Sequence, residues 1–302
     1  MKSDGEPPMS DPVSPWPAEG FHREDMEKVT KTGRVESFGQ LALVVRVAYA
    51  RFVEIAQEQK LGGDRAGVVW FRGETRGYPS LVPKIDRQCG RGHEKSLLQH
   101  FRMQALCRRA ACPSDGEYSR WLCLAQHHGL PTRLLDWTES LFTAAYFAVA
   151  HEPCEEDAVV WALSPVLLNL HFAEEGFLFI LDGLDGISLV KGAFAGQPYV
   201  PPVGSALQKI SGKVNLNEAV LAAKAPEVDM SMMVQHAAFT IHAGSTPLQA
   251  VGLKAGFLQR FTISHGYRAA LMRELAVAGL HRASVFPDLG NLAHFLTDAC
   301  SR

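Results

Sequence analysis

Apolar residues recur along this chain with two different spacings. Where they recur at every third or fourth position, they predict an amphipathic helix. The segments with this spacing are 37–60, 94–110, 117–128, 267–278 and 291–300. Residues 141–150, LFTAAYFAVA, are apolar on every side, which predicts a helix buried in the core.

Short β-branched and aromatic runs between breaker residues predict strands. These runs are 67–73, 157–165, 237–244 and 258–265. Residues 186–205 mix short apolar runs with glycine and proline, so we expect them to be irregular. Strands scattered between helices are typical of an α+β domain, here a single domain with a small mixed β-sheet flanked by helices.

The first 35 residues differ from the rest of the chain. They mix prolines and charges with few apolar side chains, too few to offset the conformational entropy lost on folding. We therefore expect a flexible N-terminal arm over residues 1–35 and one folded domain over residues 36–302.

Composition narrows the classes of protein that remain. A formal net charge of -2 gives no chain-wide attraction to nucleic acid or to a membrane surface. The N-terminus lacks the basic and apolar order of a secretory signal, and the apolar runs are shorter than the ~20 residues that span a bilayer. We expect a cytoplasmic protein. The chain contains no GxGxxG, P-loop or HExxH motif, which argues against a Rossmann site, a P-loop NTPase and a zinc protease.

The stretch VWFRGE, residues 69–74, places an arginine where a predicted strand ends. The guanidinium of Arg72 is a rigid fork of donors that suits a phosphate or a carboxylate. Gly73 would let a ligand approach the backbone closely. The structural alternative is an ion pair between Arg72 and Glu74, Asp86 or Asp136.

Residues 127–137, HHGLPTRLLDW, gather several polar side chains into one turn. His127 and His128 project about 100° apart on a helix, so only one of them needs to face a ligand. A histidine at this position also caps the helix C-terminus, which is the structural alternative. Asp136 lies three residues after Arg133 and is close enough to hold its guanidinium, and we expect Trp137 to anchor the turn.

Four stretches together resemble the FRG domain family, which is named for its (F/Y)RG signature. They are VWFRGE at 69–74, LAQHHGLPTRLLDWTESLFTAAYFAV at 124–149, VQHAAFTIH at 234–242 and HRASVFPDLGNLAHFL at 281–296. The resemblance spans about residues 66–296 and implies an FRG-type α+β domain. Because a fold does not by itself define an activity, the chemistry has to be argued from the residues.

The order of the candidate groups resembles, in their roles, the ADP-ribosyltransferase folds. Those folds grip NAD in a small split sheet, with an Arg or His on an early strand, an aromatic or hydroxyl residue next, and a Glu or Gln on a later strand. Arg72, then His127 or His128 with Thr132, then Gln235 follow that order. The resemblance implies an NAD-dependent enzyme, either an ADP-ribosyltransferase or an NAD glycohydrolase, and a split sheet. A role as a toxin or in phage defence fits a family of this sort.

On this hypothesis Arg72 and Arg133 grip the pyrophosphate, Gln235 holds the ribose hydroxyls, and Glu74 or Glu139 supplies a carboxylate. The expected catalytic residues are Arg72, Glu74, His127, His128 and Gln235. The expected NAD-binding residues are Arg72, Gly73, Thr132, Arg133, Asp136 and Trp137. We expect no metal, because adjacent histidines rarely reach one ion together.

Two other functions remain open from the sequence. A metal-independent ribonuclease would use His127 or His128 as general base and acid, since histidine titrates near neutral pH. A module that binds a nucleotide or a protein and catalyses nothing is the second alternative. A protein or RNA acceptor is a further expected partner of the transferase.

Overall fold

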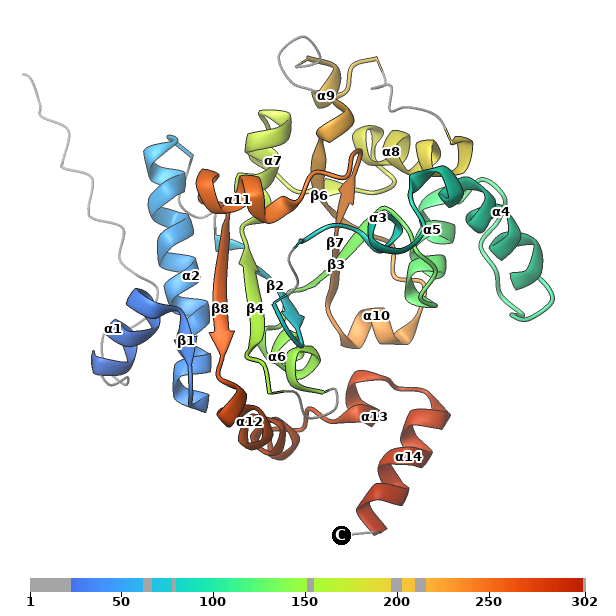
Figure 1. Cartoon of the computed structure of the whole chain (residues 1–302). Coiled ribbons are helices and arrows are strands. Elements are labelled where there is room, and N and C mark those ends of the chain that lie inside the picture. Colours follow the sequence, from blue (N-terminus) through green and yellow to red (C-terminus); the bar gives the residue numbers. More distant parts are fainter. Residues whose placement is uncertain are drawn as a thin grey trace, which may run out of the picture.

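A computed structural model describes residues 23–61, 67–77, 80–150, 155–196, 203–209 and 216–300 of the chain. These residues form one α+β domain around an open mixed sheet (Figure 1). In spatial order the strands are β1 (Arg34–Val35), β8 (Leu258–Ile263), β4 (Ala158–Leu163), β2 (Trp70–Glu74), β3 (Leu134–Thr138), β7 (Ala237–His242), β6 (Val220–Lys224) and β5 (Phe179–Ile180). The two outermost pairs are parallel and the inner pairs are antiparallel. The α+β class predicted from the sequence is confirmed.

All four predicted strands are present, as β2, β4, β7 and β8. β4 is buried at every position, which explains its continuous apolar sequence AVVWAL. The expectation that residues 127–137 form one turn is wrong for the second half of this stretch. Residues 134–138 form β3 in the middle of the sheet. Leu134 packs into one hydrophobic cluster and Leu135 into the other, so this short strand is buried on both sides.

The sheet is weakly joined between β2 and β3. Phe71 and Thr138 form the single residue pair between these two strands, both of which are described in full. By contrast, β2 pairs with β4 over five residues, and β3 pairs with β7 over five residues. The sheet therefore opens beyond Phe71, where Arg72, Gly73 and Glu74 of β2 do not pair with β3.

Helices pack around the sheet to form two hydrophobic clusters. The first cluster involves α2 (Phe38–Glu58), α6 (Leu141–Val149) and α12 (His265–Val277), and the second involves α4 (Glu94–Ala105), α5 (Tyr118–His127) and α8 (Leu184–Ala195). The remaining α-helices in the described ranges are α1 (Arg23–Thr32), α3 (Lys84–Gln88), α7 (Pro165–Ala173), α9 (Ala206–Lys209), α10 (Met230–Val234), α11 (Leu248–Ala255), α13 (Arg282–Val285) and α14 (Leu289–Cys300). In Figure 1, α2 lies beside the β1 edge, whereas α4, α5 and α8 lie by the other half of the sheet.

The helices predicted from periodicity are confirmed as α2, α4, α5, α6, α12 and α14. Ser37 caps α2, since its side-chain oxygen accepts a hydrogen bond from the backbone N–H of Gln40. Gly129 follows the end of α5 with a φ of 82°, a left-handed conformation that favours glycine.

The expectation that residues 186–205 are irregular is wrong in part. Residues 184–195 form α8, because Leu189, Val190 and Ala193 bury their side chains in the second cluster and this packing outweighs the glycines. Residues 203–205 contain no helix or strand, as expected. Residues 197–202 lie outside the described residues.

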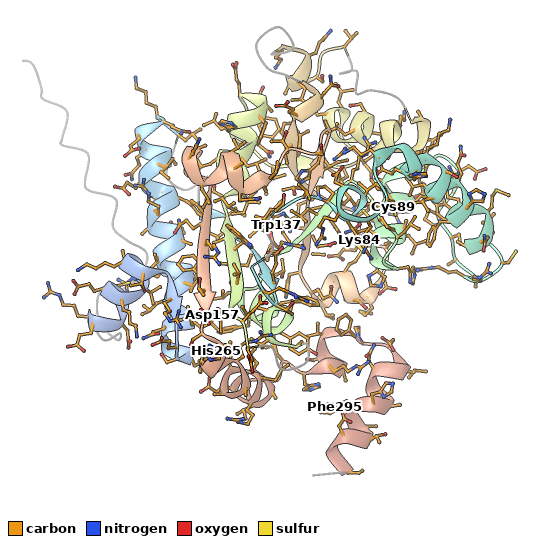
Figure 2. The ribbon with its side chains drawn as sticks, viewed as in Figure 1. Lys84, Cys89, Trp137, Asp157, His265 and Phe295 are labelled. Carbon is orange, nitrogen blue, oxygen red and sulfur yellow. The ribbon has the colours of Figure 1, made fainter. Side chains whose placement is uncertain are left out.

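Part of the expected N-terminal arm is folded. Residues 1–22 lie outside the described residues, but α1 packs on α2 and β1 pairs with the end of β8. Arg34 also donates to Asp157, which accepts a hydrogen bond of 2.8 Å from the backbone N–H of His265 (Figure 2). This N–H and the Arg34 guanidinium hold the pKa of Asp157 below its ordinary value. The folded domain therefore begins before residue 36.

Within the described ranges, none of the helices combines the length and the apolar character needed to span a bilayer.

Candidate functional site

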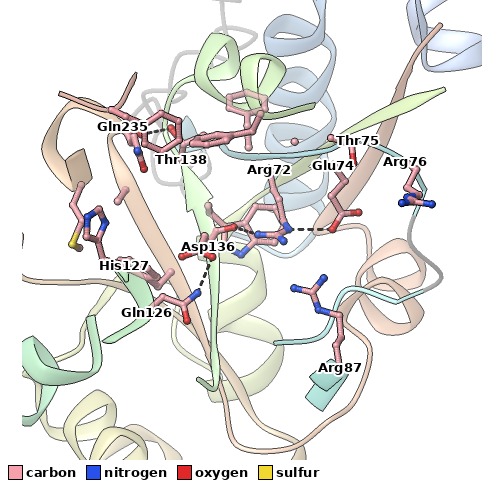
Figure 3. A pocket seen from close by; sticks show the side chains of 18 residues that line it. Arg72, Glu74, Thr75, Arg76, Arg87, Gln126, His127, Asp136, Thr138 and Gln235 are labelled. Carbon is pink, nitrogen blue, oxygen red and sulfur yellow. Dashed lines mark hydrogen bonds and ion pairs between the residues drawn. The ribbon is translucent and has the colours of Figure 1, made fainter. Parts of the chain in front are cut away.

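A cleft of about 830 Å³ lies where β2 and β3 separate (Figure 3). Its polar side chains come from both strands, from the loop after β2 and from α3, α5 and the end of α10. Those with charged, imidazole or amide groups are Arg72, Glu74, Arg76, Arg87, Gln126, His127, Asp136 and Gln235. Aromatic lining is supplied by Phe71, Trp137, Phe147, Phe239 and Phe286. The cleft therefore combines positive charge with flat apolar surfaces.

Arg72 lies at the centre of the cleft and contacts both of its sides. Its Nε donates to Glu74 Oε1 at 3.2 Å, and its Nη1 donates to the backbone carbonyl oxygen of Asp136 at 2.8 Å. The ion pair with Glu74 is the one expected from the sequence. The other two candidates are not formed, because Arg72 contacts the carbonyl oxygen of Asp136, and the two carboxylate oxygens of Asp86 accept from Nε and Nη2 of Arg91.

Glu74 is the buried carboxylate of the cleft, with 4% of its side chain exposed. Its second oxygen, Oε2, accepts a hydrogen bond of 3.0 Å from Nε1 of Trp161 on β4. Both oxygens are therefore held by fixed donors. Glu139, the alternative carboxylate, is exposed and pairs with Lys224 at 2.6 Å outside the cleft lining.

Asp136 presents an exposed carboxylate that Gln126 orients. Gln126 Nε2 donates to Asp136 Oδ2 at 2.8 Å, and the buried Thr132 donates from Oγ1 to Gln126 Oε1 at 2.6 Å. Thr132 is not part of the cleft lining, so its effect on the site passes through Gln126. Gln126 was not among the residues expected at the site, although it lies next to the histidine pair.

Two further arginines line the cleft and were missed from the sequence. Arg76 follows β2, and Arg87 belongs to α3, a short helix that the spacing of apolar residues did not predict. Figure 3 shows both guanidinium groups at the same end of the cleft as Glu74. Arg76 is exposed and has no hydrogen bond or ion pair within the described part of the chain. The sequence feature that could have indicated Arg76 is its position four residues after Arg72.

Arg133 lies away from the cleft, contrary to expectation. Its Nε and Nη2 donate to Glu94 Oε2 at 2.9 and 2.7 Å, and its Nη1 donates to the backbone oxygen of Leu189 at 3.0 Å. The guanidinium is buried, and a buried charge is stable when it is paired and fully hydrogen-bonded. Arg133 thus joins β3 to α4 and α8 and does not hold Asp136.

The structure separates the two adjacent histidines. His127 lines the cleft, and its Nε2 lies 3.4 Å from Oδ1 of Asp229. Burial would raise the pKa of Asp229, but the Ser231 backbone N–H, His127 and Arg109 lower it below its ordinary value. His128 is outside the lining, with its ring 6.4 Å from that of Phe101, and partial burial together with the charges of His127 and Arg109 lowers its pKa. One histidine, His127, belongs to the site.

Gln235 and Trp137 both line the cleft, as expected. Gln235 follows α10, and its Nε2 donates to the backbone oxygen of Val285 at 3.0 Å. Trp137 is 3% exposed and donates from Nε1 to Oγ1 of Thr240 at 3.1 Å, which agrees with its expected anchoring role.

Gly73 also lines the cleft, but close packing within the protein is the reason that this position requires glycine. A Cβ at this position would lie 1.8 Å from the backbone oxygen of Ala144 on α6. The close approach is therefore between β2 and a helix, and not between the backbone and a ligand.

Residues 67–157 match the family model described as the FRG domain. The matched range contains most polar side chains of the cleft, from Arg72 to Asp136, whereas Gln235 and Phe286 lie outside it. No curated protein and no solved structure matches the chain. Within the described residues, no group of three or more His, Cys, Asp or Glu side chains is arranged to hold a metal ion.

Proposed function

This chain carries an FRG domain, and we propose that the cleft beside its FRG motif binds NAD and breaks the bond between nicotinamide and ribose. The product is either free ADP-ribose or an ADP-ribosylated acceptor. The observation that carries the proposal is the presence of a buried, doubly hydrogen-bonded carboxylate, Glu74, in the same cleft as three arginines. The opening of the sheet between β2 and β3 supports the comparison with a split NAD-binding sheet.

The arginines supply the affinity for the diphosphate. Arg72, Arg76 and Arg87 reach the cleft from β2, from the loop after it and from α3. Guanidinium groups bind phosphate oxygens through paired, charge-assisted hydrogen bonds. The diphosphate of NAD offers several such oxygens on two linked groups, so it suits donors that converge from three segments.

Glu74 supplies the electrostatic stabilisation. When the bond between ribose C1′ and the nicotinamide nitrogen breaks, its electron pair leaves with nicotinamide and the ribose becomes cationic. A fixed carboxylate stabilises that charge without reorganising. Water or an acceptor nucleophile then bonds to C1′ and releases a proton, and we assign its acceptance to the exposed carboxylate of Asp136.

The geometry favours this function over a ribonuclease. A ribonuclease of the kind considered above needs an acid and a base at one phosphate, and His128 lies outside the cleft that His127 lines. Loss of cellular NAD would be consistent with a role as a toxin or in phage defence.

The test is release of nicotinamide from NAD by the purified protein. Glu74→Gln keeps the shape of the side chain and removes its charge, so turnover should fall by about 100-fold or more while NAD still binds. Arg51→Gln, on the exposed side of α2, is the matched surface control and should leave turnover unchanged. If the wild-type protein releases no more nicotinamide than Glu74→Gln, the enzymatic proposal fails, and NAD binding without turnover would identify a binding module.

A further inference from the structure

The end of the cleft away from Arg76 and Arg87 has a different chemistry. Figure 3 shows Gln235 and Thr138 at this end, with Arg72 between them and the other two arginines. Gln235 joins this end to the last residue of α13, because its Nε2 donates to the backbone oxygen of Val285. The residue that follows, Phe286, lines the cleft.

Two phenylalanines form an aromatic corner here. The rings of Phe147 on α6 and Phe286 lie with their centroids 5.9 Å apart and their planes at 80°. Both side chains are partly exposed and both line the cleft. A flat ring that stacks on one of them meets the other edge to face. Stacked and edge-to-face contacts are the two preferred geometries of aromatic pairs. The corner is therefore shaped for a planar heteroaromatic group.

The amide of Gln235 is held in one orientation. Its backbone oxygen accepts from Thr138 Oγ1 at 2.6 Å, while its side-chain Nε2 donates to Val285 at 3.0 Å. Because the amide nitrogen faces Val285, the amide oxygen faces away from it. That oxygen, Oε1, has no hydrogen-bond partner among the residues that the structure describes, so it remains a fixed acceptor.

We propose that Gln235, Phe147 and Phe286 form a subsite for the aromatic ring of a nucleotide that carries an amino group. The ring stacks in the corner, and its NH₂ group donates to Gln235 Oε1. This inference rests on the proposed function and assigns Gln235 to a ring in place of the ribose hydroxyls expected from the sequence. NAD has two rings of this chemistry, the adenine with its amine and the nicotinamide with its carboxamide.

Pairs of ligands that differ in the amino group test the subsite. ADP and IDP differ in the adenine amine, and nicotinamide mononucleotide and nicotinic acid mononucleotide differ in the carboxamide nitrogen. Titration calorimetry on the wild-type protein should show a preference of about tenfold or more for the amino-bearing member of one pair, which identifies the ring that is bound.

Two substitutions test the contribution of the Gln235 amide and that of the aromatic corner separately. Gln235→Leu should bring the preferred pair to equal affinity, because the acceptor is lost. Phe286→Leu should weaken both members of that pair by about tenfold and keep their ratio, since only the stacking surface changes. Gln99→Leu, on the exposed face of α4, is the matched control and should change neither.

The outcomes distinguish this inference from the function on which it rests. Equal affinities within both pairs on the wild-type protein, with nicotinamide still released from NAD, would overturn the subsite and leave the proposed function standing. Absence of both nucleotide binding and nicotinamide release would overturn the two together. The comparison of ligands needs no variant, so a variant that misfolds does not remove the test.

Discussion

The guanidinium of Arg72 on β2 donates to the backbone carbonyl oxygen of Asp136 on β3 at 2.8 Å, across the part of the sheet where these strands no longer pair. The same side chain donates to Glu74 at 3.2 Å. Arg72 therefore satisfies a backbone oxygen that a continuous sheet would have bonded to a strand. It also holds a carboxylate in the cleft that this opening creates.

Replacing Arg72 should affect both stability and the site. Lysine has one ammonium group and no planar fork, so Arg72→Lys cannot keep both contacts in the same geometry. We expect a loss of about 1.5–3 kcal/mol in the free energy of unfolding and a fall of at least about tenfold in NAD affinity. Urea unfolding and calorimetry measure these two quantities, with Arg51→Lys as the control. Unchanged values of both would contradict the bridging role.

Gly73 should tolerate no side chain. The Cβ of Gly73→Ala would lie 1.8 Å from the Ala144 backbone oxygen, so α6 would have to move away from β2. We expect a large fall in the thermal midpoint or failure to fold. Gly266→Ala is the matched control, because a Cβ there meets nothing within 4 Å and alanine favours the helix by up to about 1 kcal/mol. Similar midpoints for the two variants would show that β2 and α6 are not tightly packed.

The pair of Arg133 and Glu94 should stabilise the fold and leave catalysis alone. Arg133→Met would leave Glu94 charged and buried without its partner, which costs about 3–5 kcal/mol. The double variant Arg133→Met/Glu94→Leu should be less destabilised than the sum of the two single variants. Urea unfolding of the four proteins gives this coupling. A well-folded Arg133→Met protein that has lost NAD turnover would instead return Arg133 to the site.

His242 should make stability depend on pH. Burial, with the nearby charges of Arg91 and Arg72, lowers the pKa of His242 from 6.5 to about 3. Between these two values the unfolded chain binds a proton that the folded protein does not, so stability falls as the pH falls through this window and is fully present above it. Urea unfolding from pH 7 to pH 4 should therefore show a steeper loss for the wild type than for His242→Gln. If the free energy of unfolding depended on pH in the same way in both proteins, the claim that His242 is neutral when buried would be refuted.

Much of the fold follows from the local sequence. The spacing of apolar residues located α2, α4, α5, α6, α12 and α14, because one face of each has to be buried and the period of that face is a local property. The same logic failed for α8 and β3. α8 contains glycines that disfavour a helix, and its apolar residues become decisive only when α4 and α5 pack against them. β3 is five residues long and begins directly after a turn, so no period could be seen.

The candidate site was predicted in part. Arg72, Glu74, His127, Asp136 and Gln235 do lie around one cleft. Arg133 was placed there because it is close to Asp136 in sequence, but its partner Glu94 is 39 residues away along the chain. Arg87 was missed because no local pattern distinguishes a basic residue that faces a cleft from one that faces solvent.

By itself, the sequence determined the α+β class, the main helices and strands and the resemblance to the FRG family, because these depend on spacing and on motifs along the chain. Only the tertiary structure decided which side chains meet. The separation of β2 from β3, the burial of Arg133 and the joining of Gln235 to Val285 all depend on contacts between distant segments. Such contacts form when the hydrophobic faces of whole elements pack together, and no short stretch of sequence contains that information.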